Sequence, residues 1–304
     1  MRLTFFLFCM VISILIPIYN RNVVPLVNAL SEQAKLLNIP YEIICLDDCS
    51  KEHRNENSDL NTIANVSYIE LEENIGRSKI RNKLAEYSQY EHLLFIDNDM
   101  LVFNPLYLKH YVDVLPLGDC IYGGLTYVDK IDRSDFYLRW YYGTMREAIS
   151  VEQRNRSPYI SIKPCNLLIN KKIFNAVKFD ERFSSYGHED TLFSLGLEAM
   201  NAKVVHIDNP LLHDGLEDAE VFLMKLKSSC INLKHLIASQ SLSSLNSIKL
   251  VKVANLIIKF RLHKIYTRVY ALFSNGFENN LKSTNASLIV LDLFKLNEFL
   301  KNGS

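Results

Sequence analysis

The chain has 304 residues, of which 48% are hydrophobic and 22% charged, so it can build one large or two modest domains and is not globally disordered. Only 10 glycines and 8 prolines are present, which excludes collagen-like and low-complexity proteins. The formal net charge is zero, which argues against a protein built mainly to grip nucleic-acid phosphates.

The N-terminal segment is the first element to interpret. Residues 1–16 are mostly apolar and contain one arginine, but they lack an Ala-x-Ala cleavage pattern and continue directly into Pro17. About 15 apolar residues are short for a membrane span. We therefore predict a buried strand over residues 11–16, preceded by a short apolar leader, and a signal anchor remains the alternative.

Strand and helix patterns alternate through the first 115 residues. A second buried strand is predicted over residues 41–46 and further strands over 66–71 and 92–96, while helices are predicted over 24–37 and 78–87. Strands separated by single helices pair in parallel, and such sheets bind ligands beyond the carboxyl ends of their strands. The predicted fold is therefore α/β with a mostly parallel sheet.

The middle of the chain is irregular and rich in aromatic residues. We expect a strand over residues 160–170, a helix starting at Lys171, a second helix over 188–200 and a strand over 204–207. The aromatic side chains indicate either helix packing or a wall for a sugar ring, and both interpretations stay open. They are Tyr127, Phe136, Tyr137, Trp140, Tyr141 and Tyr142.

The composition changes near residue 230. Residues 231–304 contain ten Lys and Arg against three acids, a net charge of +7, so the preceding part carries −7. We therefore divide the chain into a catalytic domain, residues 1–230, and a basic, mainly helical extension, residues 231–304. Residues 246–270 predict a basic amphipathic helix, which either lies on an anionic membrane or packs on the core with a solvated face. Its apolar positions are Ile248, Val251, Leu256, Phe260 and Val269.

The six cysteines form no Cys-x-x-Cys pair, so a zinc ribbon or a thioredoxin-like site is not expected. Cys45 and Cys165 lie in apolar runs, where free cysteine behaves as a small hydrophobic residue. We interpret the cysteines as reduced and expect a cytoplasmic protein, peripheral at most to the inner face of the membrane.

Acidic residues follow the predicted strand over residues 92–96. Two carboxylates in Asp97-Asn98-Asp99 can hold a divalent cation and, through it, a diphosphate, although Asp and Asn also cap ordinary turns. Earlier in the chain, Gly76 and Arg77 stand at the start of the helix predicted over residues 78–87. A glycine and an arginine at a helix N-terminus favour the binding of anions. Neither a Walker A loop nor a Gly-x-Gly-x-x-Gly motif occurs.

Taken in order, five motifs resemble the family 2 glycosyltransferases of the GT-A fold. The resemblance covers about residues 11–215, and it implies a Rossmann-like, mostly parallel central sheet flanked by helices, followed here by the C-terminal helical extension. It also implies transfer of a sugar from a nucleotide-diphosphosugar, usually with uracil as the base. The motifs are Ile14-Leu15-Ile16-Pro17-Ile18-Tyr19-Asn20, Leu46-Asp47-Asp48-Cys49-Ser50, Asn74-Ile75-Gly76 with Arg81-Asn82, Asp97-Asn98-Asp99, and Gly187-His188-Glu189-Asp190.

The resemblance implies roles for residues on the nucleotide side of the site. Pro17, Tyr19 and Asn20 are expected to line the nucleotide pocket. Asp48 is expected to hydrogen-bond the base, and Arg81 to lie beside the nucleotide.

A second group is implied around the ribose, the diphosphate and the donor sugar. Asp97 is expected to approach the ribose and Asn166 to lie near the sugar. Asp99 is expected to bind Mn²⁺ or Mg²⁺, with His213 as a further metal ligand.

Glu189 and Asp190 are expected to face the acceptor, a saccharide or a lipid-linked sugar, with Asp190 as the general base. A carboxylate can take a proton from an acceptor hydroxyl, and a bound cation stabilises the departing diphosphate. If the base lies opposite the leaving group, transfer inverts the anomeric centre. We expect a role in surface polysaccharide or glycolipid assembly.

Two positions depart from the family pattern and keep other interpretations open. Cys49 replaces the usual glycine of Asp-Asp-Gly-Ser, and Gly196 stands where an arginine is usual. A degenerate domain that binds a nucleotide-sugar without catalysis is therefore one alternative. A sugar nucleotidyltransferase is another, but Tyr19-Asn20-Arg21-Asn22 stands where its Gly-rich, Lys-containing loop is expected.

Overall fold

The computed structural model describes residues 11–182, 187–239, 245 and 248–301, so the apolar leader predicted at the N-terminus lies outside the described part. The chain divides into two compact units. The described residues of Met1–Tyr127, Glu147–Ser184 and Glu189–Gly215 form one, called here the sheet unit. Those of Val128–Arg146, Ser185–His188 and Leu216–Ser304 form the other, the helical unit.

This division differs from the boundary predicted at residue 230. The difference arises because helix α6 (Tyr137–Arg146) and helix α10 (Ala219–Ser239) share an apolar core. Leu138 of α6 packs with Phe222 and Leu226 of α10, so residues 128–146 and the chain from Leu216 belong together.

The sheet unit is built on a seven-stranded sheet with the order β3-β2-β1-β4-β8-β6-β9. The first four strands in this order, β3, β2, β1 and β4, pair in parallel with their neighbours. Strand β8 is antiparallel to β4 and β6, and β9 is parallel to β6. The predicted α/β class with a mostly parallel sheet is confirmed. The strands are β1 (Ile12–Ile18), β2 (Tyr41–Asp47), β3 (Val66–Glu70), β4 (His92–Ile96), β6 (Cys120–Tyr122), β8 (Asn166–Asn170) and β9 (Val204–His206).

The predicted strands β1 to β4 are confirmed within two residues at each end. Their apolar runs are buried because helices cover both faces of a parallel sheet. The strand predicted over residues 160–170 is wrong in its first half, since only β8 is extended. Pro164 lacks a backbone N–H for a ladder, and Ile160 is exposed rather than buried.

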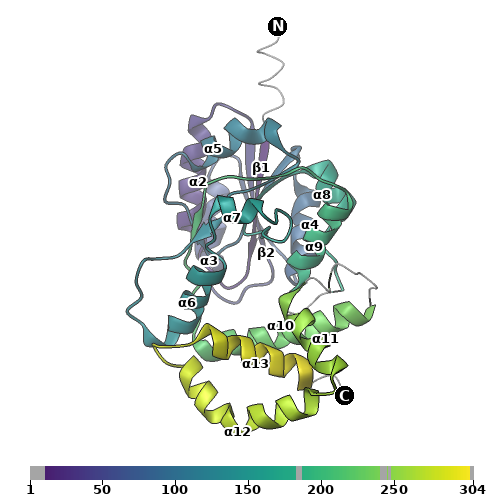
Figure 1. Cartoon of the computed structure of the whole chain (residues 1–304). Helices are drawn as coiled ribbons and strands as arrows, with labels where there is room; N and C mark the ends of the chain where they lie inside the picture. The colour runs from purple at the N-terminus through teal and green to yellow at the C-terminus, as the bar shows by residue number, and fades with distance from the viewer. Residues whose placement is uncertain (1–10, 183–186, 240–244, 246–247, 302–304) are drawn as a thin grey trace. The chain divides into compact units, whose positions relative to one another are not determined.

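Helices flank the sheet on both sides. In Figure 1, α2 and α5 lie on one side and α4, α8 and α9 on the other. On the second side Phe95 of β4 stacks on Phe174 at 5.0 Å between ring centroids, and Phe179 stacks on Phe193 at 4.4 Å. The helices are α2 (Val24–Leu36), α3 (Arg54–Ser58), α4 (Arg77–Tyr87), α5 (Tyr107–Val114), α7 (Val151–Asn155), α8 (Lys171–Val177) and α9 (Glu189–Ala199).

A small three-stranded sheet has the order β5-β10-β7, and its strand β5 follows β4 in the chain. This sheet positions residues near the C-terminal end of the sheet unit. Strand β10 (Leu211–His213) runs antiparallel to β5 (Met100–Leu101) and parallel to β7 (Leu125–Thr126). In this register His213 is opposite Met100. A histidine far along the chain is thereby placed next to the acidic residues that follow β4.

The helical unit contains α6, α10, α11 (Lys249–Lys259), α12 (His263–Leu281) and α13 (Leu288–Lys301). The single basic helix predicted over residues 246–270 is wrong, because the chain turns between α11 and α12 with Arg261 in the left-handed region at φ 58°. In the described part of the chain, every helix is too short or too polar to cross a membrane.

Two further predictions concern buried side chains. Cys45 and Cys165 are buried and free, as expected for small core residues. Of the aromatic residues in the middle of the chain, Tyr137 and Tyr142 pack against the core of the helical unit, and Tyr127 is buried in the sheet unit. For these three residues the packing interpretation is confirmed.

Candidate active site

The predicted nucleotide-side residues meet at the carboxyl ends of β1, β2 and β4. The Asn20 N–H donates to Ser50 Oγ at 2.8 Å, which ties the loop after β1 to the loop after β2. The side-chain amide of Asn98 donates to the Tyr19 carbonyl at 3.4 Å, which links the same loop to the end of β4. Pro17, at the end of β1, is half-buried, and the Tyr19 side chain is half exposed. This edge therefore presents the surface on which the sequence places the nucleotide.

Asp48 connects β2 with the loop that opens α4. Its Oδ1 accepts the Ile75 N–H at 2.7 Å, and its Oδ2 accepts the Gly76 N–H at 3.0 Å. Burial raises the pKa of the Asp48 carboxyl above its ordinary value, although the two backbone N–H groups act in the opposite direction. Each carboxylate oxygen can accept a further hydrogen bond, so contact with a base is compatible with this arrangement.

The structure explains both departures from the family pattern. Cys49 lies at φ 60°, so the turn keeps the conformation that glycine adopts, at a cost of about 1–2 kcal/mol for a residue with a Cβ. At Gly196, an added Cβ would lie 2.5 Å from Val177 Cγ1. Position 196 therefore lies at the tight contact between α9 and α8, where an arginine would force the helices apart.

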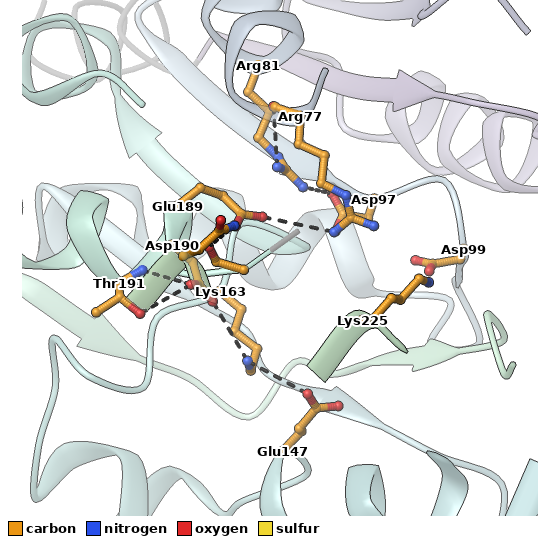
Figure 2. Close-up of polar contacts among 12 residues, drawn as sticks. Arg77, Arg81, Asp97, Asp99, Glu147, Lys163, Glu189, Asp190, Thr191 and Lys225 are labelled. Atoms are coloured by element: carbon orange, nitrogen blue, oxygen red, sulfur yellow. Dashed lines mark hydrogen bonds and ion pairs between the residues drawn. The ribbon is translucent and has the colours of Figure 1, made fainter. Parts of the chain in front are cut away.

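Arg81 and Asp97 form an ion pair at the end of β4. A terminal nitrogen of Arg81 donates to Asp97 Oδ1 at 2.6 Å, and the Arg81 side chain is only 4% exposed (Figure 2). Burial, the largest influence, would raise the pKa of Asp97, but Arg81 and weaker charges outweigh it and lower that pKa. Arg81 was predicted to lie beside the nucleotide. Its burial instead makes it a positioning residue for Asp97, which is the more accessible partner.

Asp99 and His213 form the pair predicted to bind a metal. His213 Nε2 lies 3.5 Å from Asp99 Oδ2, because β10 pairs with β5 directly after Asp99. Asp99 Oδ1 is buried and has no hydrogen-bond partner among the described residues. Gly215 completes the cradle, since an added Cβ there would lie 2.3 Å from Asp99 Oδ2.

This pair fits a cation that the substrate helps to coordinate. Within the described ranges, no three His, Cys, Asp or Glu side chains are grouped to hold a metal by themselves. Mg²⁺ and similar hard ions are commonly held by one or two carboxylates together with waters and substrate phosphates. The Asp99 carboxylate, with its unused Oδ1, and the His213 imidazole match such a partial site.

Glu189 and Asp190 begin α9, and the structure directs them into different surroundings (Figure 2). Glu189 is buried, with Oε1 3.9 Å from a terminal nitrogen of Arg77. Burial raises the pKa of Glu189, and Asp190 adds to this, while Arg81 and Arg77 oppose it. Glu189 was predicted to face the acceptor; in the structure it lies beside Arg77.

Asp190 stands at one end of a chain of contacts. Its Oδ1 accepts the Thr191 N–H at 2.7 Å, and its Oδ2 lies 3.9 Å from Lys163 Nζ. Lys163 Nζ is also 3.9 Å from Oε1 of Glu147, so one ammonium group lies between two carboxylates (Figure 2).

The chain of contacts continues toward the metal pair. The Tyr127 hydroxyl donates to Glu147 Oε2 at 2.5 Å, and the Tyr127 ring lies 5.2 Å from the His213 ring. Sequence reasoning missed Lys163, Glu147 and Gly215, since no motif surrounds them. Tyr127 was noticed only as one of several aromatic residues. The network therefore links the candidate base with the candidate metal ligand through residues from separate parts of the chain.

Asn166 corrects a prediction. It is fully buried, and its Oδ1 accepts the hydroxyls of Tyr107 and Tyr111 at 2.6 and 2.7 Å. Its amide nitrogen donates to the carbonyls of Gly124 and Asn209 at 2.7 and 2.9 Å. These four hydrogen bonds use both N–H groups of the side-chain amide and both lone pairs of its oxygen. Asn166 therefore holds β8 to its neighbouring loops and has no polar atom left for the donor sugar.

We expect Asn166→Ala to destabilise the sheet unit strongly without removing a contact to the nucleotide-sugar. It leaves the Tyr107 hydroxyl and the Asn209 carbonyl without their partners, while the Gly124 carbonyl keeps the Leu211 N–H, and each buried group left unsatisfied costs about 1–3 kcal/mol. Urea unfolding should therefore show a loss of about 3 kcal/mol or more. Asn98→Ala, which removes one long and exposed hydrogen bond, is the control. Unchanged stability together with weaker donor binding would restore the original prediction.

Comparison with known proteins supports the same picture. Residues 13–177 match the family model described as Glycosyl transferase family 2. A chondroitin synthase of Escherichia coli is 25% identical over 221 residues, which cover 61% of this chain and 32% of that protein. The chain thus spans about a third of the length of that relative.

Solved structures resemble the chain over most of its length. A mannosyltransferase from Pyrobaculum calidifontis, in complex with GDP-Man and Mn²⁺, gives a TM-score of 0.56 at 13% identity and covers 96% of this chain and 86% of that one. TarS 1-349 of S. aureus, in complex with UDP-GlcNAc, gives a TM-score of 0.50 at 18% identity and covers 96% of this chain and 92% of that one. At such identities the likeness concerns the fold, and it confirms the predicted GT-A architecture. With more than half of the residues matched by one family model, the chain belongs to glycosyl transferase family 2.

Proposed function

We propose that this protein is an inverting, metal-dependent glycosyltransferase that moves a sugar from a UDP-sugar to a saccharide or lipid-linked acceptor. The observation that carries the proposal is the network from Asp190 through Lys163, Glu147 and Tyr127 to His213 beside Asp99. It joins a carboxylate able to take a proton with a pair able to hold a cation, which are the two functions that the reaction requires.

Each of these residues has a task in the proposed reaction. Asp99 and His213 would hold Mn²⁺ or Mg²⁺, which stabilises the negative charge of the leaving nucleoside diphosphate when it is bound. Asp190 takes the proton from the acceptor hydroxyl as that oxygen attacks the sugar. Lys163 fixes the Asp190 carboxylate by bridging it to Glu147. Arg81 holds Asp97 toward the nucleotide. Direct attack by the acceptor, without an intermediate on the protein, inverts the anomeric centre.

The relatives support the substrate class. TarS 1-349 has been solved with UDP-GlcNAc, and a glucosyl-3-phosphoglycerate synthase of Mycobacterium tuberculosis with UDP and Mn²⁺. The latter gives a TM-score of 0.51 at 14% identity and covers 75% of this chain and 82% of that one. The name of the chondroitin synthase relative supports a role in polysaccharide synthesis. We place the reaction in surface polysaccharide assembly on the cytoplasmic side of the membrane.

A nucleotide-sugar screen tests this proposal. We expect one UDP-sugar, in the presence of Mn²⁺, to raise the melting temperature of the full chain and to be hydrolysed slowly to UDP and free sugar. A ligand at 100 times its dissociation constant stabilises a protein by about 2.7 kcal/mol. Chelating the metal with EDTA should remove both effects, and added Mn²⁺ should restore them.

Other outcomes separate the alternatives. Stabilisation by a nucleotide-sugar without any release of UDP, including in the presence of saccharide acceptors, would indicate a binding domain without catalysis. Release of pyrophosphate from UTP and a sugar phosphate would indicate a nucleotidyltransferase. Hydrolysis that is unaffected by EDTA would contradict the metal dependence, and hydrolysis of a GDP-sugar alone would contradict the choice of UDP.

A further inference from the structure

Helices α11 and α12 present apolar side chains that the described residues leave largely uncovered. Leu256 and Phe260 near the end of α11 are 56% and 63% exposed, and Leu272 in α12 is 81% exposed. Single exposed apolar residues are common, but neighbouring groups of them mark interaction surfaces.

The exposed residues follow helical spacing. At about 100° per residue, side chains three and four positions apart lie on one face of a helix. Each helix therefore carries one exposed apolar stripe. The stripes consist of Val253, Leu256 and Phe260 on α11, and of Ile265, Val269 and Leu272 on α12.

These stripes are distinct from the faces by which the helices pack. On α11 the buried residues are Val251 and Ala254. On α12 they are Tyr270 and Leu281, and the hydroxyl of the half-buried Tyr266 donates to the Leu293 carbonyl of α13 at 2.9 Å. The packing interpretation of this segment thus accounts for one face of each helix and leaves the apolar stripe unexplained.

Basic residues border the stripes. Residues 245–277 contain six Lys and Arg and no Asp or Glu. Projected at about 100° per residue, Lys252 and Lys259 lie beside the stripe of α11 and Arg268 beside that of α12, while Arg261 lies in the turn between the two helices. The six basic residues are Lys249, Lys252, Lys259, Arg261, Lys264 and Arg268.

The charge of this surface is not neutralised within the unit. None of the six forms an ion pair with a carboxylate in the described part of the chain. The nearby acids have other partners, since Asp292 pairs with Arg146 at 3.0 Å and Glu278 with Lys282 at 2.9 Å.

We propose that the α11–α12 surface, defined by the two stripes and the six basic residues, docks the enzyme on an anionic phospholipid bilayer. In such a complex the apolar side chains enter the boundary between head groups and acyl chains. The long Lys and Arg side chains reach up to the lipid phosphates. The bilayer matches both features of the surface at once.

Other classes of partner match either the apolar stripes or the basic residues of this surface, but not both. A second copy of the chain would cover the apolar stripes but would bring the same six positive charges face to face, which costs binding energy. A nucleic acid would match the charges and leave the aliphatic side chains without a partner. The proposal adds a binding activity to the proposed function and does not depend on sugar transfer, since it is measured without donor or acceptor.

Vesicle co-sedimentation of the full chain tests the proposal. We expect binding to vesicles with 30% phosphatidylglycerol, little binding to pure phosphatidylcholine, and loss of binding in 0.5 M NaCl. Each Lys or Arg near an anionic surface changes the partition constant about fivefold. The triple variant Lys252→Gln, Lys259→Gln, Arg268→Gln should therefore bind about 100-fold more weakly. The control is Lys35→Gln, Lys130→Gln, Lys172→Gln, which removes three exposed charges elsewhere and should bind like the unchanged chain.

A second variant tests the apolar part of the surface. Leu256→Ser, Val269→Ser, Leu272→Ser should also lose vesicle binding, and because these positions are exposed the fold does not depend on them. Equal binding of all variants, or equal binding to neutral and anionic vesicles, would overturn the proposal. So would failure to bind vesicles combined with self-association that the serine variant abolishes, because the occupant would then be a second copy.

Discussion

Replacing Asp190 by asparagine is expected to lower the rate of sugar transfer by about 10²–10⁴-fold, the usual cost of losing a general base. Asparagine keeps the size and one oxygen of the side chain, so the hydrogen bond from the Thr191 N–H can remain. It cannot take the proton of the acceptor hydroxyl. Donor binding should change little, because Asp190 contacts Lys163 and not the Asp99–His213 pair.

Initial-rate kinetics together with calorimetric titration of UDP in Mn²⁺ measures both quantities. The matched control is Glu198→Gln, which neutralises an exposed acid on the same helix. Glu189→Gln should differ from both variants, since Glu189 lies beside Arg77, and we expect it to alter donor binding. The assignment fails if the Asp190 variant transfers sugar at nearly the original rate, or if it loses UDP binding.

Replacing Asp99 by alanine is expected to abolish metal-dependent binding of the donor and, with it, transfer. The change removes the carboxylate of the candidate metal pair and leaves only His213 Nε2. Excess Mn²⁺ should restore little activity, because a single imidazole is a weak site for a hard cation. Titration of UDP with and without Mn²⁺ measures the effect directly, and the unchanged chain should show a metal-dependent increase in affinity that the variant lacks.

Gly215→Ala provides an independent check on the same site. An added Cβ would lie 2.3 Å from Asp99 Oδ2 and must displace that carboxylate. The variant should therefore weaken metal-dependent UDP binding although it removes no charged group. Asp113→Ala, which removes an exposed carboxylate paired with Lys109, should leave UDP binding unchanged. If Asp99→Ala keeps full metal-dependent turnover, the diphosphate site lies elsewhere.

Much of the fold is predictable from local sequence. Strands β1, β2 and β4 are mostly apolar, and an apolar strand buried by helices on both faces needs no long-range information to be recognised. The acids that follow β2 and β4 were placed at the ligand edge for the same reason, because parallel strands bring their carboxyl ends to one side. The family resemblance rested on these local motifs.

Other features depended on partners that local patterns do not reveal. The break between α11 and α12 lies inside one continuous apolar and basic pattern, so the sequence predicted a single helix. Strand β8 pairs antiparallel with β4 and begins only after Pro164, although the apolar residues start earlier. The packing of α6 on α10 shifted the division of the chain, since that contact joins segments far apart in sequence.

The order of the elements and the carboxylates that follow the strands can be predicted from local sequence, because both depend on residues close together in the chain. The contacts of each side chain, in contrast, depend on the folded structure. It brought His213 to Asp99 through the pairing of β10 with β5, and it enclosed Asn166 among two tyrosines. It also gave Glu189 and Asp190 different partners, Arg77 and Lys163, which come from distant parts of the chain. Contacts between distant segments leave no periodic signal in the sequence, so their partners appear only when the chain is folded.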